Sequence, residues 1–149
     1  MRTFLLATTV FAFTLIGCSS NKVTNNDIYD SEWELTEYID NSGSVINNDD
    51  NIIISFRDSA MVAGNTGCNL FIGKYSLNES KIKFENIGST KVFCGEDKAQ
   101  KEQNYLNALS LELEAEISSN GEELILKNAE KGIKIKYIKC KESKTPEIK

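Results

Sequence analysis

The 149-residue chain contains no histidine, and only one proline and one tryptophan. Without histidine, the sequence excludes every Ser–His–Asp triad, every histidine metal site and the usual proton shuttle at neutral pH. It also lacks a phosphate-binding glycine loop, a nucleophile-elbow serine and a dinucleotide-binding fingerprint. Lys and Arg total 17 against 22 Asp and Glu, and a net charge of −5 argues against a nucleic-acid binder. We therefore expect a protein that is not an enzyme, uses no cofactor or resident metal and binds no nucleic acid.

The N-terminus has the pattern of a secretory signal peptide, in which Arg2 precedes an apolar run. The run ends in Leu15–Cys18 (LIGC), a tetrapeptide that resembles the lipobox of bacterial lipoproteins. We predict a lipoprotein signal peptide over residues 1–17 and acylation of Cys18, whose acyl chains would bind membrane lipid. By resemblance to lipoprotein sorting, Ser19 favours the outer membrane in a Gram-negative host, so the expected location is the cell envelope. The alternatives are a plain signal peptide or an uncleaved anchor.

The rest of the chain is predicted to be mainly β, because short runs alternate apolar and polar residues with the period of a strand. The apolar positions of these runs are Trp33, Leu35, Ile52, Ile54, Phe56, Ile82, Phe84, Leu124, Leu126, Ile133, Ile135 and Tyr137. Residues 96–113 instead carry apolar side chains at helical spacing, with a helix end expected near Ser110 and a strand from Leu113. The expected fold is a small antiparallel lipocalin-like barrel, or a curled sheet, with one α-helix.

Composition divides the chain beyond the signal peptide into three parts. Residues 18–30 are polar and low in bulk, which predicts a flexible tether. Residues 31–138 form the domain, and residues 139–149 are expected to be a frayed tail. Within the domain, Asn120-Gly121 lies between two strand-like runs, and this dipeptide is typical of a type I′ hairpin.

The densest pattern in the chain is a glycine-rich motif that precedes and enters a strand. Gly64 and Gly67 allow a tight or left-handed backbone beside a strand end. Asn69 can close a turn by bonding its own backbone. Gly73 allows a bulge inside a strand, and Tyr75 can pack while its hydroxyl stays bonded. The nearer role of these residues is therefore structural.

This motif, together with the Trp33-x-Leu35 strand and a helix carrying Glu102 and Leu109, resembles the META-domain family, which includes the HslJ-like bacterial lipoproteins. The matching motif positions are Gly64, Gly67, Cys68, Asn69, Gly73, Tyr75, Thr90 and Cys94. The resemblance covers nearly all of residues 31–138. It implies a β-rich barrel with a helix and membership of the bacterial envelope, with links to heat stress, motility or drug tolerance in some members. It supplies no defined biochemical activity.

From these patterns we expect a non-enzymatic cell-envelope lipoprotein, a binding or interaction module in envelope or heat-stress tolerance. Its partners would be membrane lipid, through acylated Cys18, and an unidentified envelope protein. The alternative is a barrel that binds a small apolar ligand, since a closed barrel of about eight strands has room for at most one.

Three cysteines remain if Cys18 is acylated. Cys68 and Cys94 both belong to the family pattern, and in an oxidising compartment the economical interpretation is a disulfide. Two buried free thiols, or a redox thiol at Cys94, remain as alternatives. Cys140 lies outside the pattern and could be free, pair in a dimer or join the other two in a three-sulfur metal site, although structural zinc sites usually have four ligands.

Two further patterns have competing interpretations. Glu112, Glu114 and Glu116 alternate with apolar residues, which favours a solvated strand face over a pair of acid–base carboxylates. Asp58-Ser59-Ala60 resembles an O-glycosylation acceptor used by some envelope-dwelling bacteria. The alternative for this tripeptide is a simple turn between Phe56 and Met61.

Overall fold

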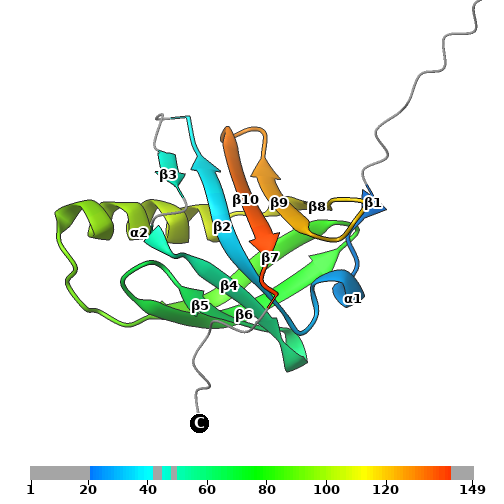
Figure 1. Ribbon diagram of the computed structural model, residues 1–149, viewed down its shortest axis with the longest axis horizontal. Coiled ribbons are helices and arrows are strands. Elements are labelled where there is room, and N and C mark those ends of the chain that lie inside the picture. Colours follow the sequence, from blue (N-terminus) through cyan, green and yellow to red (C-terminus); the bar gives the residue numbers. More distant parts are fainter. Residues whose placement is uncertain (1–20, 42–44, 48–49, 142–149) are drawn as a thin grey trace, which may run out of the picture.

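The computed structural model describes residues 21–41, 45–47 and 50–141, which form a mainly β domain with one substantial helix (Figure 1). Its strands are β1 (Asn21–Lys22), β2 (Ser31–Ile39), β3 (Val45–Asn47), β4 (Ile53–Arg57), β5 (Met61–Asn65), β6 (Leu70–Asn78), β7 (Lys81–Ser89), β8 (Leu113–Ile117), β9 (Glu123–Asn128) and β10 (Ile133–Lys139). Its helices are α1 (Asn25–Ile28), α2 (Glu96–Leu109) and a short 3-10 turn, η2 (Asp58–Ala60).

Eight of the described strands close into an antiparallel barrel, which confirms the predicted fold class. Hydrogen bonds join neighbours in the order β8–β7–β6–β5–β4–β2–β10–β9, and a further pairing of β8 with β9 completes the ring. The short strands β1 and β3 add to this ring beside β8 and β2. Most neighbours in the ring are consecutive in the chain, so the barrel is built largely from hairpins.

The interior of the barrel is filled by the side chains that alternation predicted to point inward. All of those residues are buried except Ile133, which is half-buried where β10 begins. The largest fully buried side chains are Trp33, Tyr38, Tyr105, Tyr137 and Phe56. Large rings at these positions bury much apolar area and leave little space between the strands.

Helix α2 covers the interior between β6 and β10. Its buried face carries Glu102, Tyr105, Ala108 and Leu109. The Tyr105 ring centroid lies 6.4 Å from that of Phe71, and its hydroxyl oxygen is 2.9 Å from the hydroxyl oxygen of Tyr137. The predicted helix and the strand from Leu113 are both confirmed.

The first described residues belong to the domain, which contradicts the flexible tether predicted for residues 18–30. Val23 and Ile28 insert into the hydrophobic core, and β1 pairs with β8. Thr24 and Asp27 form a capping box around α1, and the hydrogen bonds from Thr24 lower the pKa of Asp27. The predicted signal peptide, Cys18 and residues 19–20 lie outside the described residues.

The far border of the domain also differs from the prediction. β10 continues through Lys139, and the backbone N–H of Cys140 donates to the Glu32 carbonyl at 2.8 Å. Lys139 therefore belongs to the sheet and Cys140 is bonded to its edge, so neither is part of the frayed tail predicted for residues 139–149. Residues 142–149 lie outside the described residues.

The hairpin predicted at Asn120-Gly121 joins β8 and β9, but its turn is not of type I′. Residues 118–122 join β8 to β9, and of Asn120 and Gly121 only the glycine has a positive φ, 73°. A type I′ turn needs positive φ at both central residues. The structure has this arrangement between β6 and β7, where Glu79 and Ser80 have φ values of 47° and 71°. The dipeptide thus predicted the position of a hairpin correctly and its turn type wrongly.

Candidate functional site

The two motif glycines at the end of the β4–β5 hairpin leave no space for a side chain. A Cβ on Gly64 would lie 2.1 Å from the Ile53 carbonyl oxygen and 2.5 Å from the Phe71 ring. Gly67 has a φ of +86°, and its Cβ would lie 2.5 Å from the Asp50 carbonyl oxygen. A larger residue at Gly64 would push β5 away from β4 and β6, and one at Gly67 would be strained and would push the turn away from Asp50.

Gly73 and Tyr75 have the packing roles that the sequence indicates. The register of β6 against β7 shifts between Ile72 and Lys74, so Gly73 lies at an irregularity. Tyr75 is buried and meets Phe56 edge-on, with ring centroids 5.0 Å apart at 83°. Burial raises the pKa of the Tyr75 hydroxyl.

Asn69 lies at the centre of a buried hydrogen-bond network. Its Oδ1 accepts from the Val92 backbone N–H and from the Thr90 hydroxyl, each at 2.7 Å. Its Nδ2 donates to Glu102 Oε2 at 2.8 Å and to the Val92 carbonyl at 3.1 Å. The amide therefore joins the start of β6, the segment before α2 and α2 itself.

Thr66 and Glu102 complete this network. The Thr66 hydroxyl accepts from the Asn69 N–H at 3.0 Å and lies 3.1 Å from Glu102 Oε2. The Thr66 N–H donates to the Asn69 carbonyl at 2.8 Å. Thr66, Asn69 and Glu102 are all buried, and we call these residues with Thr90 the polar lock. Sequence reasoning did not single out Thr66, although a threonine three residues before an asparagine in a turn is a signal for such a bond.

A disulfide holds the same region together. Cys68 and Cys94 are bonded, with their Cα atoms 6.0 Å apart. The bond ties the end of the motif to the segment immediately before α2, alongside the contacts of Asn69 with Val92. In this state neither sulfur is available as a nucleophile or metal ligand.

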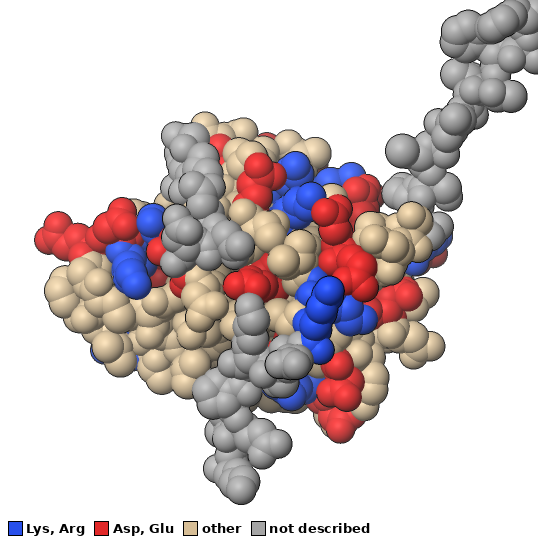
Figure 2. Space-filling view, in the orientation of Figure 1, with Lys and Arg blue, Asp and Glu red and all other residues tan. Residues whose placement is uncertain are grey.

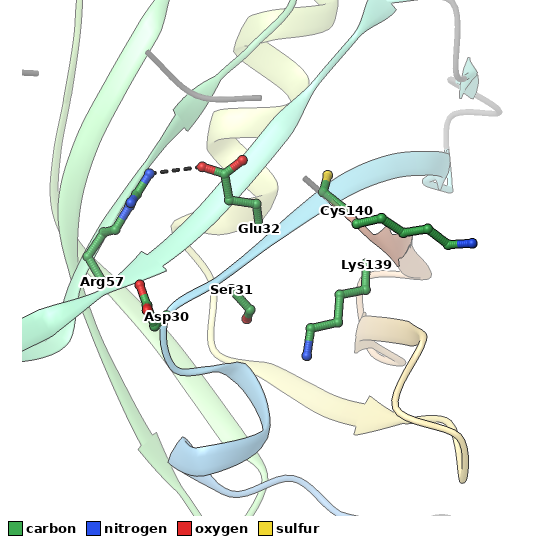
Figure 3. Close-up of a pocket in the computed structure, with 7 residues that line it drawn as sticks. Asp30, Ser31, Glu32, Arg57, Lys139 and Cys140 are labelled. Atoms are coloured by element: carbon green, nitrogen blue, oxygen red, sulfur yellow. Dashed lines mark hydrogen bonds and ion pairs between the residues drawn. The ribbon is translucent and has the colours of Figure 1, made fainter. Parts of the chain in front are cut away.

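Cys140 lies apart from this disulfide, beside a small polar cavity of about 290 Å³ (Figure 3). Arg57 and Glu32 point toward each other across it and form an ion pair at 2.9 Å. Lys139 also lines the cavity, and its Nζ lies 5.6 Å from the Trp33 ring centroid. The cavity is thus lined by side chains of both charge signs. Among the described residues, no group of three or more His, Cys, Asp or Glu side chains is placed to hold a metal ion.

The outer surface beside the polar lock is apolar. Leu70 and Ile72 on β6 are 40% and 49% exposed, and Val92 and Phe93 are 61% and 77% exposed. The Thr90 N–H donates to the Leu70 carbonyl at 3.0 Å, so the two segments lie side by side. We call these four residues the apolar patch. Figure 2 shows an area poor in charged side chains below α2, on the side where the segment before α2 runs.

The acidic residues in and just before β8 lie on the outside of the barrel. Glu112 forms ion pairs with Lys83 at 2.8 Å and Lys81 at 3.4 Å. The hydrogen bond from Lys83, followed by that from Lys81, lowers the pKa of Glu112. Glu116 pairs with Lys127 across the β8–β9 ladder. These carboxylates are spread along strands and paired with lysines, an arrangement typical of a solvated face.

The filled interior argues against the alternative that the barrel binds a small apolar ligand. The described cavities are lined by loop and edge residues, such as Asn104, Asn107 and Leu111 in one and Ser118, Asn120 and Ile138 in another. Inside the ring, Trp33 and Tyr137 occupy the space that a ligand would need. In the described part of the chain, neither helix is long and apolar enough to span a bilayer.

Comparison with known proteins finds one family and several related structures. The META domain family matches residues 26–139. An NMR structure of a protein from Burkholderia xenovorans is 19% identical, with a TM-score of 0.70 over 92% of this chain and 100% of that one. A second NMR structure is 20% identical, with a TM-score of 0.60 over 78% and 94%. A crystal structure of a DUF4847 family protein from Bacteroides vulgatus is 11% identical, with a TM-score of 0.53 over 80% and 99%. No curated protein sequence matches the chain. At these identities the structures show the fold alone.

Proposed function

This chain belongs to the META-domain family, and we propose that it is a non-enzymatic lipoprotein of the bacterial cell envelope. In this proposal the domain is an interaction module that supports the envelope under stress such as heat. The observation that carries it is the apolar patch, where Val92 and Phe93 are among the most exposed large apolar side chains described. Exposed apolar side chains gathered in one place mark interaction sites on soluble domains.

The polar lock explains how such a patch can stay rigid. Asn69 bonds both the N–H and the carbonyl of Val92, and the disulfide fixes Cys94 two residues later. A preformed surface loses less conformational entropy on binding than a mobile loop does. The family motif therefore has a use beyond stability, because it holds the exposed segment in one conformation.

The sequence supports attachment through Cys18 at the other end of the domain. β1 begins at Asn21, so at most about 11 Å of extended chain separates its first Cα from that of Cys18. In Figure 1, β1 and the segment before α2 lie at opposite ends of the long axis. Acyl chains on Cys18 would then keep β1 near the bilayer and turn the apolar patch away from it. A disulfide between Cys68 and Cys94 also fits an oxidising compartment outside the cytoplasm.

Replacement of the anchoring cysteine tests the location. We expect Cys18→Ser to stop acylation and to move the protein from the detergent phase to the aqueous phase in phase partitioning. Intact mass spectrometry of both proteins shows whether residues 1–17 are removed and whether acyl chains are present. A wild-type protein that retains its first methionine and carries no lipid would contradict the proposed location.

Replacement of the patch tests the interaction. We expect the double variant Val92→Ser and Phe93→Ser to fold with unfolding free energy within about 0.5 kcal/mol of wild type, because both side chains are exposed. Cells carrying it should survive heat shock no better than cells without the protein. Tyr29→Ser removes an exposed aromatic ring outside the patch and is the matched control, which should keep wild-type survival. Equal survival with all three proteins would count against an interaction through the patch.

A further inference from the structure

The tip of the β4–β5 hairpin presents a serine hydroxyl to solvent. Asp58, Ser59 and Ala60 form η2, and all three are exposed. Ser59 and Ala60 have φ values of 59° and 57°, so the hairpin turns tightly at this point. The Ser59 hydroxyl makes no hydrogen bond to another described residue, whereas the Asp58 carboxylate accepts one from the Tyr29 hydroxyl.

The chain contains a second Asp-Ser dipeptide, and it serves as an internal comparison. Ser31, which follows Asp30, is 7% exposed. Its Oγ accepts from the Trp33 Nε1 at 2.8 Å and donates to the Ile28 carbonyl. The next residue, Glu32, is buried and paired with Arg57. Of these two dipeptides, only the one at the hairpin tip therefore combines an exposed hydroxyl with an exposed acidic neighbour and an exposed small neighbour.

We propose that Ser59 is the acceptor of an O-linked glycan. This inference rests on the proposed export, because the donor would be a glycan on a polyprenyl diphosphate outside the cytoplasm. Ser59 Oγ attacks the anomeric carbon of the glycan, and the bond from that carbon to the diphosphate breaks. The hydroxyl proton passes to a base of the transferase, and polyprenyl diphosphate leaves. The transferase would recognise the carboxylate of Asp58 and the methyl group of Ala60 on either side of the hydroxyl.

The position of Ser59 is compatible with the proposed interaction. Arg57 pairs with Met61 next to the tip, whereas Ile53 pairs with Asn65 at the other end of the same hairpin. The motif and the apolar patch begin at that other end. A glycan on Ser59 would therefore add a bulky polar group beyond the tip and leave the patch accessible.

The test uses the full protein purified from its native membrane. Trypsin cleaves after Arg57 and Lys74, so after reduction and alkylation one peptide carries Ser59. We expect this peptide to have the mass of a glycan in addition to its own, with fragmentation placing the glycan on Ser59. Ser59→Ala and Asp58→Asn should both lose the glycan, and Ser59→Thr should keep it. Ser76→Ala, which removes an exposed serine that follows no aspartate, should also keep it.

The same measurement separates this inference from the proposed function. If the protein is acylated at Cys18 but the peptide with Ser59 is unmodified, the glycan proposal is overturned and the envelope location stands. If the glycan persists in Asp58→Asn, or is found on another residue, the assignment to this tripeptide is also wrong. A protein with its first methionine, no lipid and no glycan contradicts both proposals. Thermal melting of each variant confirms that it is folded before its mass is compared.

Discussion

Two sets of polar side chains connect separate elements of this barrel, and they differ in their access to water. The polar lock is buried at its centre, with Asn69 and Glu102 only 5% and 8% exposed, although Thr90 at its edge is exposed. The lysine–glutamate pairs on β7 to β9 lie on the outer surface, where the Lys83 and Glu112 side chains are 55% and 40% exposed. Both sets have short hydrogen bonds, so geometry alone does not distinguish them.

Access to water determines how much each set of polar side chains contributes to folding stability. When an exposed ion pair forms, its two side chains give up contacts with water for contact with one another, so the net gain in folding stability is small. A buried amide that loses its partners cannot recover them from solvent, so its loss costs much more. We infer that the lock determines the conformation of the Val92 segment, whereas the surface pairs add solubility and little stability.

The largest effect is expected when the centre of the lock is removed. Asn69→Ala deletes the bonds to Thr90, Val92 and Glu102 and leaves the Glu102 carboxylate buried without its amide donor. We expect a loss of about 4 kcal/mol in unfolding free energy, measured by urea denaturation. Asn78→Ala, at the exposed end of the same strand, is the control and should lose less than about 1 kcal/mol. Equal losses of unfolding free energy in the two variants would contradict a larger contribution from the polar lock.

The disulfide should rank second, because it restrains the same segment through the unfolded chain. Replacing Cys68 and Cys94 by Ala opens a loop with a sequence separation of 26. The loop-entropy estimate is roughly 3 kcal/mol. We expect the variant to melt lower than wild type in oxidising buffer and to be insensitive to reductant. Cys140→Ala should keep the wild-type response to reductant, and a reductant-insensitive wild-type protein would argue against this contribution.

The strands and the long helix could be predicted because each has a regular apolar period. Trp33 and Leu35 alternate with wetter neighbours, and Tyr105 and Leu109 are spaced as on a helix. The N-terminal border could not be found in this way, since Val23 and Ile28 are two isolated apolar residues in a polar segment. Their burial depends on pairing with β8, which follows almost a hundred residues later.

The candidate site was predictable only in part, for a similar reason. The sequence identified Asn69 and the glycines, but it assigned Asn69 a bond to its own backbone. In the structure its side chain bonds Val92 and Glu102, which are 23 and 33 residues away. Local rules cannot identify partners at that separation. The exposure of Phe93 could likewise not be predicted from the sequence, because an apolar residue before a helix is more often buried.

The tyrosine pair inside the barrel gives an intermediate test of water access. Tyr105 and Tyr137 are fully buried with hydroxyls 2.9 Å apart, and burial raises the pKa of both. Above pH 10, the ordinary tyrosine pKa, the unfolded chain loses protons that the folded protein keeps. Stability should therefore fall as pH rises above 10, by about 1.4 kcal/mol per pH unit for each tyrosine. At neutral pH, Tyr105→Phe should cost about 1 kcal/mol, because Tyr137 loses its partner.

The slope of unfolding free energy against pH, measured between pH 10 and 11, distinguishes this explanation from general alkaline unfolding. Tyr105→Phe should reduce the slope of unfolding free energy by about half of the two-tyrosine contribution. Ser76→Ala removes an exposed hydroxyl that does not titrate in this pH range and should leave the slope close to wild type. If the two variants have the same slope, buried tyrosines do not cause the alkaline loss.

The smallest effect is expected on the outer surface. Glu112→Gln removes the ion pairs with Lys83 and Lys81, and we expect the melting temperature at neutral pH to change by less than about 2 °C.

The lysines lower the pKa of Glu112 in the folded protein, so its contribution to stability is present above the ordinary carboxyl pKa and disappears as pH falls through the folded pKa. The difference between wild type and Glu112→Gln should therefore vanish in acid and shrink in about 1 M salt, where the screening length is about 3 Å. Asn69→Ala should keep its full effect in that salt, because the Asn69 amide is uncharged and both it and Glu102 are buried, where salt screens little. A salt-insensitive loss in Glu112→Gln as large as that of Asn69→Ala would show that burial is not what separates the two polar sets.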